Sequence, residues 1–130
     1  SEMCIRDRSG TWYQVTDQGA REGNYLESSA TALFIYTLAK AVNKGYISKD
    51  YIEPTRKAFD GMVKTFTRLE EDGSYTITNC CAVAGLGGDS KRYRDGSFEY
   101  YISEPVIEND PKSVGSFILA AIEYEKMTDK

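Results

Sequence analysis

Histidine is absent from this chain of 130 residues, and cysteine and proline occur only three times each. Without histidine the chain cannot supply a Ser–His or Cys–His nucleophile pair, or a histidine-bearing zinc site. An odd number of cysteines, two of them adjacent, does not suit a disulfide framework, so we expect a reducing, cytoplasmic compartment. No apolar run approaches the roughly 20 residues that span a bilayer, and no signal-peptide pattern is visible.

Basic residues are also outnumbered. Sixteen Lys and Arg face 20 Asp and Glu, which gives a formal net charge of -4. The basic side chains are scattered along the sequence, so we expect neither a nucleic acid nor an anionic membrane as a partner. With 41% apolar and 28% charged residues, the chain has the composition of a soluble globular protein, and its length suits one domain.

The first eight residues, SEMCIRDR, share no periodicity with the rest of the chain. They resemble read-through of a sequencing adapter at the end of an assembled read. We therefore expect residues 1–8 to be non-native, with the biological chain entering near Ser9 as an interrupted reading frame. On this interpretation Cys4 is not native, and the native N-terminus is missing.

Three segments have the periodicity of helices with an apolar face, and we expect helices over residues 27–43, 54–68 and 112–126. Gly45 is placed to end the first, and Asp110 is a suitable N-cap for the third. The side chains expected on the apolar stripes are Leu33, Phe34, Thr37, Leu38, Ala41 and Val42, then Ala58, Phe59, Met62, Val63 and Phe66, and finally Phe117, Ile118, Ala121 and Ile122.

Little β-structure is expected. Residues 69–78 contain a Glu-Asp-Gly turn followed by alternating Tyr75 and Ile77, which predicts a short hairpin. Residues 11–25 and 79–109 are rich in Gly and Tyr and are expected to be loops. The first helix is apolar on nearly all sides and therefore requires partners on both sides. Three helices and a hairpin cannot provide them, so the chain is expected to be part of a larger all-helical body.

The longest expected loop region includes residues 85–112, GLGGDSKRYRDGSFEYYISEPVIENDPK. This stretch contains four glycines, four aromatic and ten charged residues between two apolar segments. Compact domains rarely contain so long an irregular segment unless it binds something. Aromatic rings that can stack on a sugar, together with many polar partners, favour a carbohydrate site.

Several blocks closely resemble the C-terminal part of glycoside hydrolase family 105, the unsaturated rhamnogalacturonyl hydrolases. The blocks are GTWYQVTDQGAREGNYLESSATALFIYTLAKAVNKGYI, CCAVAGLGG, YRDGSFEYYISEP and NDPKSVGSFILAAIE. The resemblance implies an all-α fold, a partial six-hairpin (α/α)6 toroid of which residues 9–130 form closing helices and rim loops. A whole toroid needs roughly 300 residues or more, so the missing N-terminal part of the same domain would be a partner.

The resemblance also implies a reaction. Family members hydrate the 4,5-double bond of an unsaturated galacturonyl unit at the non-reducing end of pectin (rhamnogalacturonan) oligosaccharides. A carboxylic acid protonates C4, water adds at C5, and the resulting hemiketal collapses and releases the aglycone. The family's catalytic aspartate lies upstream of the matched region, so no catalytic residue, cofactor or metal is expected in this chain, which should be inert alone. The alternatives are a related unsaturated glucuronyl hydrolase of glycosaminoglycan fragments, and a non-catalytic helical module that binds carbohydrate.

Candidate substrate contacts lie in the loops. Trp12 could stack on a sugar or simply pack against the next hairpin. Glu27 could accept a hydrogen bond in the cleft. The alternative interpretation of this segment is ordinary helix capping by Ser28 or Ser29. The candidate substrate-binding residues are Trp12, Gln14, Tyr25, Glu27, Tyr100, Tyr101 and Glu104.

The remaining polar and thiol groups have simpler interpretations. Asp95 precedes a glycine and is first of all a turn residue. Glu104 could contact the ligand or hold its loop through backbone hydrogen bonds. The adjacent Cys80 and Cys81 are expected to be small buried apolar groups rather than metal ligands.

Overall fold

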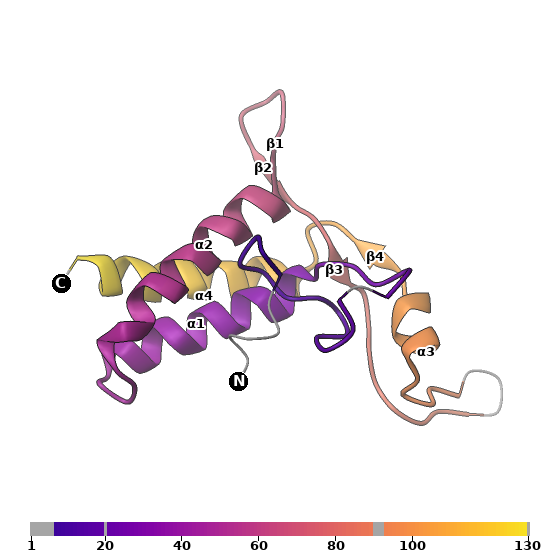
Figure 1. Ribbon diagram of the computed structural model, residues 1–130. Coiled ribbons are helices and arrows are strands. Elements are labelled where there is room, and N and C mark those ends of the chain that lie inside the picture. The colour runs from indigo at the N-terminus through magenta and orange to yellow at the C-terminus, as the bar shows by residue number, and fades with distance from the viewer. Residues whose placement is uncertain (1–6, 20, 90–92, 130) are drawn as a thin grey trace.

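The structure is a computed structural model that describes residues 7–19, 21–89 and 93–129. Most of the expected non-native stretch, including Cys4, lies outside these ranges. Three long helices dominate the described part: α1 (Ser28–Asn43), α2 (Ile52–Phe66) and α4 (Pro111–Thr128). Helices α1 and α4 run side by side in the same direction, whereas α2 runs antiparallel to both (Figure 1). No helix in the described ranges is both long enough and apolar enough to cross a membrane.

Two small antiparallel ribbons accompany the helices. In the first, Leu69 pairs with Tyr75 across a turn that contains Gly73 at φ +84°, which confirms the expected hairpin. The second ribbon and a short helix lie in segment 79–109, where only loops were expected. Strands of two residues have no alternation that a sequence pattern could show. The short elements are η2 (Lys49–Tyr51), β1 (Thr67–Leu69), β2 (Tyr75–Ile77), β3 (Cys80–Cys81), α3 (Phe98–Ser103) and β4 (Val106–Ile107).

The helix bounds differ most from the prediction in α2. This helix begins two residues earlier than expected, because the 3₁₀ turn η2 leads directly into it. It ends at Phe66 rather than residue 68, because Thr67 is extended (φ -107°, ψ 134°) and begins β1. The predicted Gly45 terminator of the first helix and the predicted Asp110 N-cap of the third are confirmed: Gly45 has φ +72° just after α1, and Asp110 caps α4 by accepting a hydrogen bond from the Lys112 amide.

The core lies where the three helices meet. Small side chains at the contact between α1 and α4 allow the two backbones to approach closely, among them Ala39 and Ser113, which are both fully buried. Between α2 and α4, the rings of Phe59 and Tyr124 stack with centroids 3.9 Å apart. The buried core cluster comprises Trp12, Ala32, Ile35, Ala58, Met62, Phe66 and Ala120.

Part of the predicted apolar stripes is exposed, which corrects the sequence interpretation. Leu33 is 46% exposed, Ile118 54% and Ile122 44%. The buried residues of these two helices are instead mostly small: Ser28, Thr31, Ala32, Ile35 and Ala39 in α1, and Ser113, Ser116, Ala120 and Met127 in α4. Helices α1 and α4 therefore carry more apolar surface than the described residues cover.

A close contact between α2 and the N-terminal loop gives a test of the packing. A Cβ atom on Gly61 would lie 1.9 Å from the carbonyl oxygen of Ser9, whereas one on Gly115, in α4, would meet nothing within 4 Å. We expect Gly61→Ala to lower the free energy of unfolding by about 2 kcal/mol or more through overpacking. Gly115→Ala is the matched control and should raise it by up to about 1 kcal/mol through helix propensity. Urea unfolding followed by circular dichroism measures both, and equal effects would contradict the described contact.

Candidate functional site

Six of the seven predicted site residues lie around strand β3, and we call Gln14, Tyr25, Glu27, Tyr100, Tyr101 and Glu104 the rim cluster. Hydrogen bonds connect Gln14 to Tyr25, and Glu27 and Tyr100 to the chain segment 81–85. The Gln14 amide donates to the Tyr25 carbonyl (2.8 Å), the Cys81 amide to the Glu27 carboxylate (3.0 Å), and the Gly85 amide to the Tyr100 hydroxyl (3.0 Å). Segments from three distant parts of the sequence therefore meet at one end of α1.

Glu27 is the most buried member of the rim cluster, with 1% of its surface exposed. One carboxylate oxygen accepts from the Ala30 amide at 2.7 Å, and the other accepts from the Ser29 hydroxyl at 2.8 Å and from the Cys81 amide. Glu27 is thus the N-cap of α1, and the expectation that Ser28 or Ser29 would cap this helix is wrong. The negative carboxylate at the positive end of the helix is favourable.

Tyr25 lies beside this carboxylate, and its hydroxyl is buried. Burial raises the pKa of Tyr25 above its ordinary value of 10.0, and the neighbouring Cys81 and Glu27 raise it further. The phenol therefore stays protonated at neutral pH and can act as a hydrogen-bond donor.

Tyr100, Tyr101 and Glu104 form the other half of the rim cluster. The rings of Tyr100 and Tyr101 lie 5.1 Å apart and are tilted by 53°. Glu104 is 2% exposed and hydrogen-bonds the Tyr100 hydroxyl, and burial raises the pKa of that hydroxyl. Next to Glu104, the Pro105 carbonyl accepts from the Ala82 amide at 2.8 Å. A buried glutamate that helps to hold its loop is one of the two roles that the sequence left open.

Sequence reasoning missed Arg21, which connects the two segments that carry the rim cluster, 11–25 and 79–109; we call these segments the rim loops. Its guanidinium lies 3.8 Å from the centroid of the Phe98 ring and forms an ion pair with Glu99. Asn24 fixes the loop on the other side by bonding both the amide and the carbonyl of Val15. Arg21 and Glu99 are 78 residues apart, so no local pattern could have connected them.

Two other predictions concern buried groups. Trp12 is fully buried and packs against Phe34 with ring centroids 5.1 Å apart, so it presents no face on which a sugar could stack. Its core position is the alternative that the sequence left open. Cys80 and Cys81 are buried free thiols, as expected, and burial raises the pKa of the Cys80 thiol.

A general acid that works near neutrality needs a carboxyl group with a raised pKa. Where hydrogen bonds and charges move the pKa of a carboxyl group among the described residues, they lower it. Asp95 is an example: hydrogen bonds from the Ser97 amide and hydroxyl stabilise its charged form and lower its pKa. The groups with a lowered pKa are Asp7, Glu70, Asp72, Asp95, Glu108, Asp110 and Glu123.

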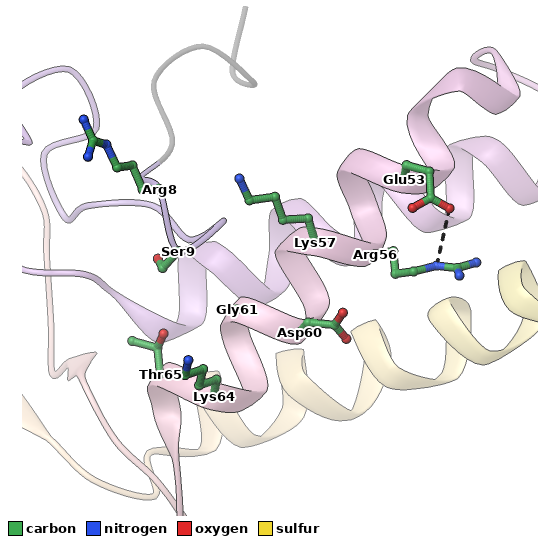
Figure 2. A pocket seen from close by; sticks show the side chains of 9 residues that line it. All are labelled: Arg8, Ser9, Glu53, Arg56, Lys57, Asp60, Gly61, Lys64 and Thr65. Atoms are coloured by element: carbon green, nitrogen blue, oxygen red, sulfur yellow. Dashed lines mark ion pairs between the residues drawn. The ribbon is translucent and has the colours of Figure 1, made fainter.

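A hollow of about 620 Å³ beside α2 is lined mostly by polar and charged side chains, but these do not converge on one point as in a ligand site. Figure 2 shows that its side chains fan out along the helix instead of converging on one point, and Arg56 is paired with Glu53 at 3.7 Å. Ligand sites require convergent polar groups. The hollow is lined by Arg8, Ser9, Glu53, Arg56, Lys57, Asp60, Gly61, Lys64 and Thr65.

The raised pKa of Tyr25 predicts a pH dependence of stability. Because the folded-state pKa lies above the unfolded value of 10.0, the contribution of Tyr25 is fully present below pH 10 and is lost as the pH rises above it. Tyr25→Phe should therefore reduce the fall of the unfolding free energy between pH 10 and pH 12. Tyr75→Phe changes a ring that is 64% exposed and should leave the fall unchanged. Urea midpoints at several pH values measure both, and identical slopes in wild type and Tyr25→Phe would contradict the buried position of the phenol.

Comparison with known proteins identifies the family. The sequence model of Glycosyl Hydrolase Family 88 matches residues 3–128. Two curated relatives are 38% identical to the chain over 125 residues: protein Atu3128 of Agrobacterium fabrum and a 24.9 kDa protein in the picA locus of Rhizobium radiobacter. These matches cover 93% of this chain and 54% of each relative, so the chain spans about half the length of the curated relatives it matches.

Solved structures agree. A family 105 glycoside hydrolase of C. acetobutylicum superimposes with a TM-score of 0.91 and 44% identity, covering 95% of this chain and 34% of that one. A possible family 105 member of Salmonella enterica serovar Paratyphi A gives a TM-score of 0.75 and 26% identity, covering 98% of this chain and 29% of the other. The predicted fold, a partial all-α (α/α)6 toroid, and the resemblance to family 105 are confirmed. Since the family model spans nearly the whole chain, the protein belongs to Glycosyl Hydrolase Family 88, and it is similar to a solved family 105 glycoside hydrolase and to a possible member of that family.

Proposed function

We propose that the chain is part of an unsaturated rhamnogalacturonyl hydrolase, which removes a 4,5-unsaturated galacturonyl unit from pectin oligosaccharides. The observation that carries this proposal is the likeness to the C. acetobutylicum family 105 hydrolase, with 44% identity and a TM-score of 0.91 over 95% of this chain. Because the match covers only 34% of that enzyme, the activity is proposed for a longer domain that contains residues 9–130.

The rim cluster supports a role in substrate binding. Gln14 and Tyr101 are partly exposed and could contact a sugar through an amide and an aromatic ring. Tyr25 could donate from its protonated hydroxyl after a local rearrangement that uncovers it. Glu27 and Glu104 are buried and hydrogen-bonded, so we propose that they hold the neighbouring loops in the geometry that the substrate requires.

The catalytic acid is proposed to come from outside the described residues. The hydration reaction needs a carboxylic acid that keeps its proton near neutrality. Among the described residues, the carboxyl groups whose pKa is displaced are displaced in the opposite direction, as Asp95 illustrates. The chain would then supply positioning and substrate contacts, and the rest of the domain the proton.

A chimera tests this function. Residues 9–129 would replace the matching third of the C. acetobutylicum hydrolase, in one continuous polypeptide. We expect the chimera to remove the ultraviolet absorbance of a 4,5-unsaturated galacturonyl-rhamnose disaccharide with a kcat/KM within about tenfold of the parent enzyme. A folded chimera that acts only on an unsaturated glucuronyl disaccharide would favour the alternative substrate. One that binds either sugar without hydrolysing it would favour a binding module.

The same chimera tests the rim cluster. Tyr101→Ala should raise KM several-fold, because a partly exposed ring beside Tyr100 is lost from the proposed cleft. Tyr93→Ala, in the same loop, removes a ring that is 70% exposed and serves as the matched control. Equal KM values for the two variants would remove Tyr101 from the proposed site.

A further inference from the structure

A pocket of about 260 Å³ lies near the C-terminal end of α1, and no residue of the rim cluster lines it. The rim cluster surrounds the start of this helix, and Ser28 and Lys40 are separated by about 18 Å along the helix axis at the usual rise per residue. In Figure 1 the start of α1 adjoins β3, whereas its other end leads into the turn before α2. The pocket is lined by Tyr36, Thr37, Lys40, Ala41, Lys44 and Tyr46.

The geometry of the helix end gathers two lysines and two tyrosines on one side. Tyr36, Lys40 and Lys44 follow each other at intervals of four residues, so they share one face of α1. Gly45 then turns the chain back with φ +72°, and the Tyr46 amide donates to the Ala41 carbonyl at 2.9 Å. This contact returns Tyr46 to the side of the helix on which the lysines lie.

Tyr36 and Lys40 form the ordered wall of the pocket. The Tyr36 ring packs against the hydrophobic core. The Lys40 ammonium lies 4.8 Å from the centroid of this ring and donates a hydrogen bond to its hydroxyl. That hydrogen bond is the largest cause of a raised pKa at Lys40, which keeps the side chain charged at neutral pH. One positive charge is thus held in place before any ligand arrives.

Lys44 and Tyr46 form the open wall. Tyr46 is 78% exposed, an unusual position for a large aromatic ring. Among the described residues, no carboxylate lies within ion-pair distance of Lys40 or Lys44. Glu123 acts on Lys40 from farther away, and it is itself paired with Lys126 at 3.1 Å. The two ammonium groups therefore have room for an added anion.

Helix electrostatics alone explains only part of this arrangement. Cations near the C-terminus of a helix are favourable, which accounts for the two lysines. It does not account for a cavity between them or for an exposed ring folded back beside them. An aromatic ring can stack on the C–H face of a sugar, and an ammonium group binds a carboxylate through charge-assisted hydrogen bonds. A ligand that uses both is a sugar that carries a carboxylate.

We propose that Tyr36, Lys40, Lys44 and Tyr46 form a second carbohydrate site, which binds a hexuronate unit of an acidic oligosaccharide away from the rim cluster. Tyr46 stacks on the sugar ring, and Lys40 and Lys44 hold its carboxylate. The site binds without chemistry, so it is separate from the hydrolysis proposed above. Only the choice of galacturonate over glucuronate as the source of the hexuronate rests on the proposed function.

Binding of saturated trigalacturonate to the full chain tests this site. This probe has no 4,5-double bond and is therefore not a substrate of the proposed reaction. Isothermal titration calorimetry should give a millimolar Kd for the wild-type chain. Lys44→Gln and Tyr46→Ala should each weaken binding about tenfold, because one removes a charged hydrogen bond and the other the stacking face. Lys49→Gln is the matched control, since it removes a nearby exposed charge that does not line the pocket.

Conservative variants and two further ligands sharpen the test. Lys44→Arg and Tyr46→Phe keep the charge and the ring and should retain the wild-type Kd, while circular dichroism shows that the helices persist in every variant. The methyl ester of trigalacturonate lacks the negative charges and should bind about tenfold more weakly. A saturated chondroitin tetrasaccharide that binds more tightly than trigalacturonate would support the hexuronate site and assign it to glucuronate.

Three results would overturn the proposal. They are no binding by the wild-type chain, equal binding of the acid and its methyl ester, and binding that Tyr101→Ala abolishes while Lys44→Gln and Tyr46→Ala leave it intact. The last result would place the sugar at the rim cluster instead. A chimera that binds trigalacturonate through Lys44 but does not hydrolyse the unsaturated disaccharide would count against the proposed function alone and would support this second site.

Discussion

The buried carboxylate of Glu27 is the constraint on which the rim depends. Its two oxygens accept hydrogen bonds from the Ala30 amide, the Ser29 hydroxyl and the Cys81 amide. These contacts cap α1 and fasten β3 to the start of that helix. Removing one partner of a buried charge lowers the free energy of unfolding by several times what a neutral hydrogen bond contributes. Loss of one of the three contacts is therefore expected to destabilise the other two.

The contacts of Glu27 also help to position both rim loops. Strand β3 pairs with β4, which fixes the end of the long loop and brings Glu104 and Tyr100 next to segment 81–85. On the other side, the Glu27 amide donates to the Trp12 carbonyl at 2.9 Å and sets the path of the loop that carries Gln14. The proposed substrate-binding side is thus organised around the start of α1.

Sequence reasoning succeeded where a long periodic pattern existed. The three long helices and the hairpin were predicted because apolar spacing, an Asp N-cap and a Gly-containing turn all report local structure. Sequence reasoning failed for elements whose formation depends on contacts between residues that are distant in the sequence. Strands β3 and β4, helix α3 and the Arg21–Glu99 pair depend on partners that are distant in the sequence. Trp12 could equally have stacked on a sugar, and only tertiary packing places it in the core. The buried faces of α1 and α4 were misjudged for a related reason: periodicity marks large apolar positions, but most of the residues that are buried on these helices are small ones such as alanine and serine.

Native-state hydrogen exchange tests the central claim most directly. If Glu27 fastens α1 and β3 as one unit, the amides of Ala30 and Cys81 should open with the same free energy, and Glu27→Ala should accelerate both exchange rates together. Exchange at Cys81 that is already fast in the wild-type protein, or that Glu27→Ala leaves unchanged while Ala30 accelerates, would contradict the account.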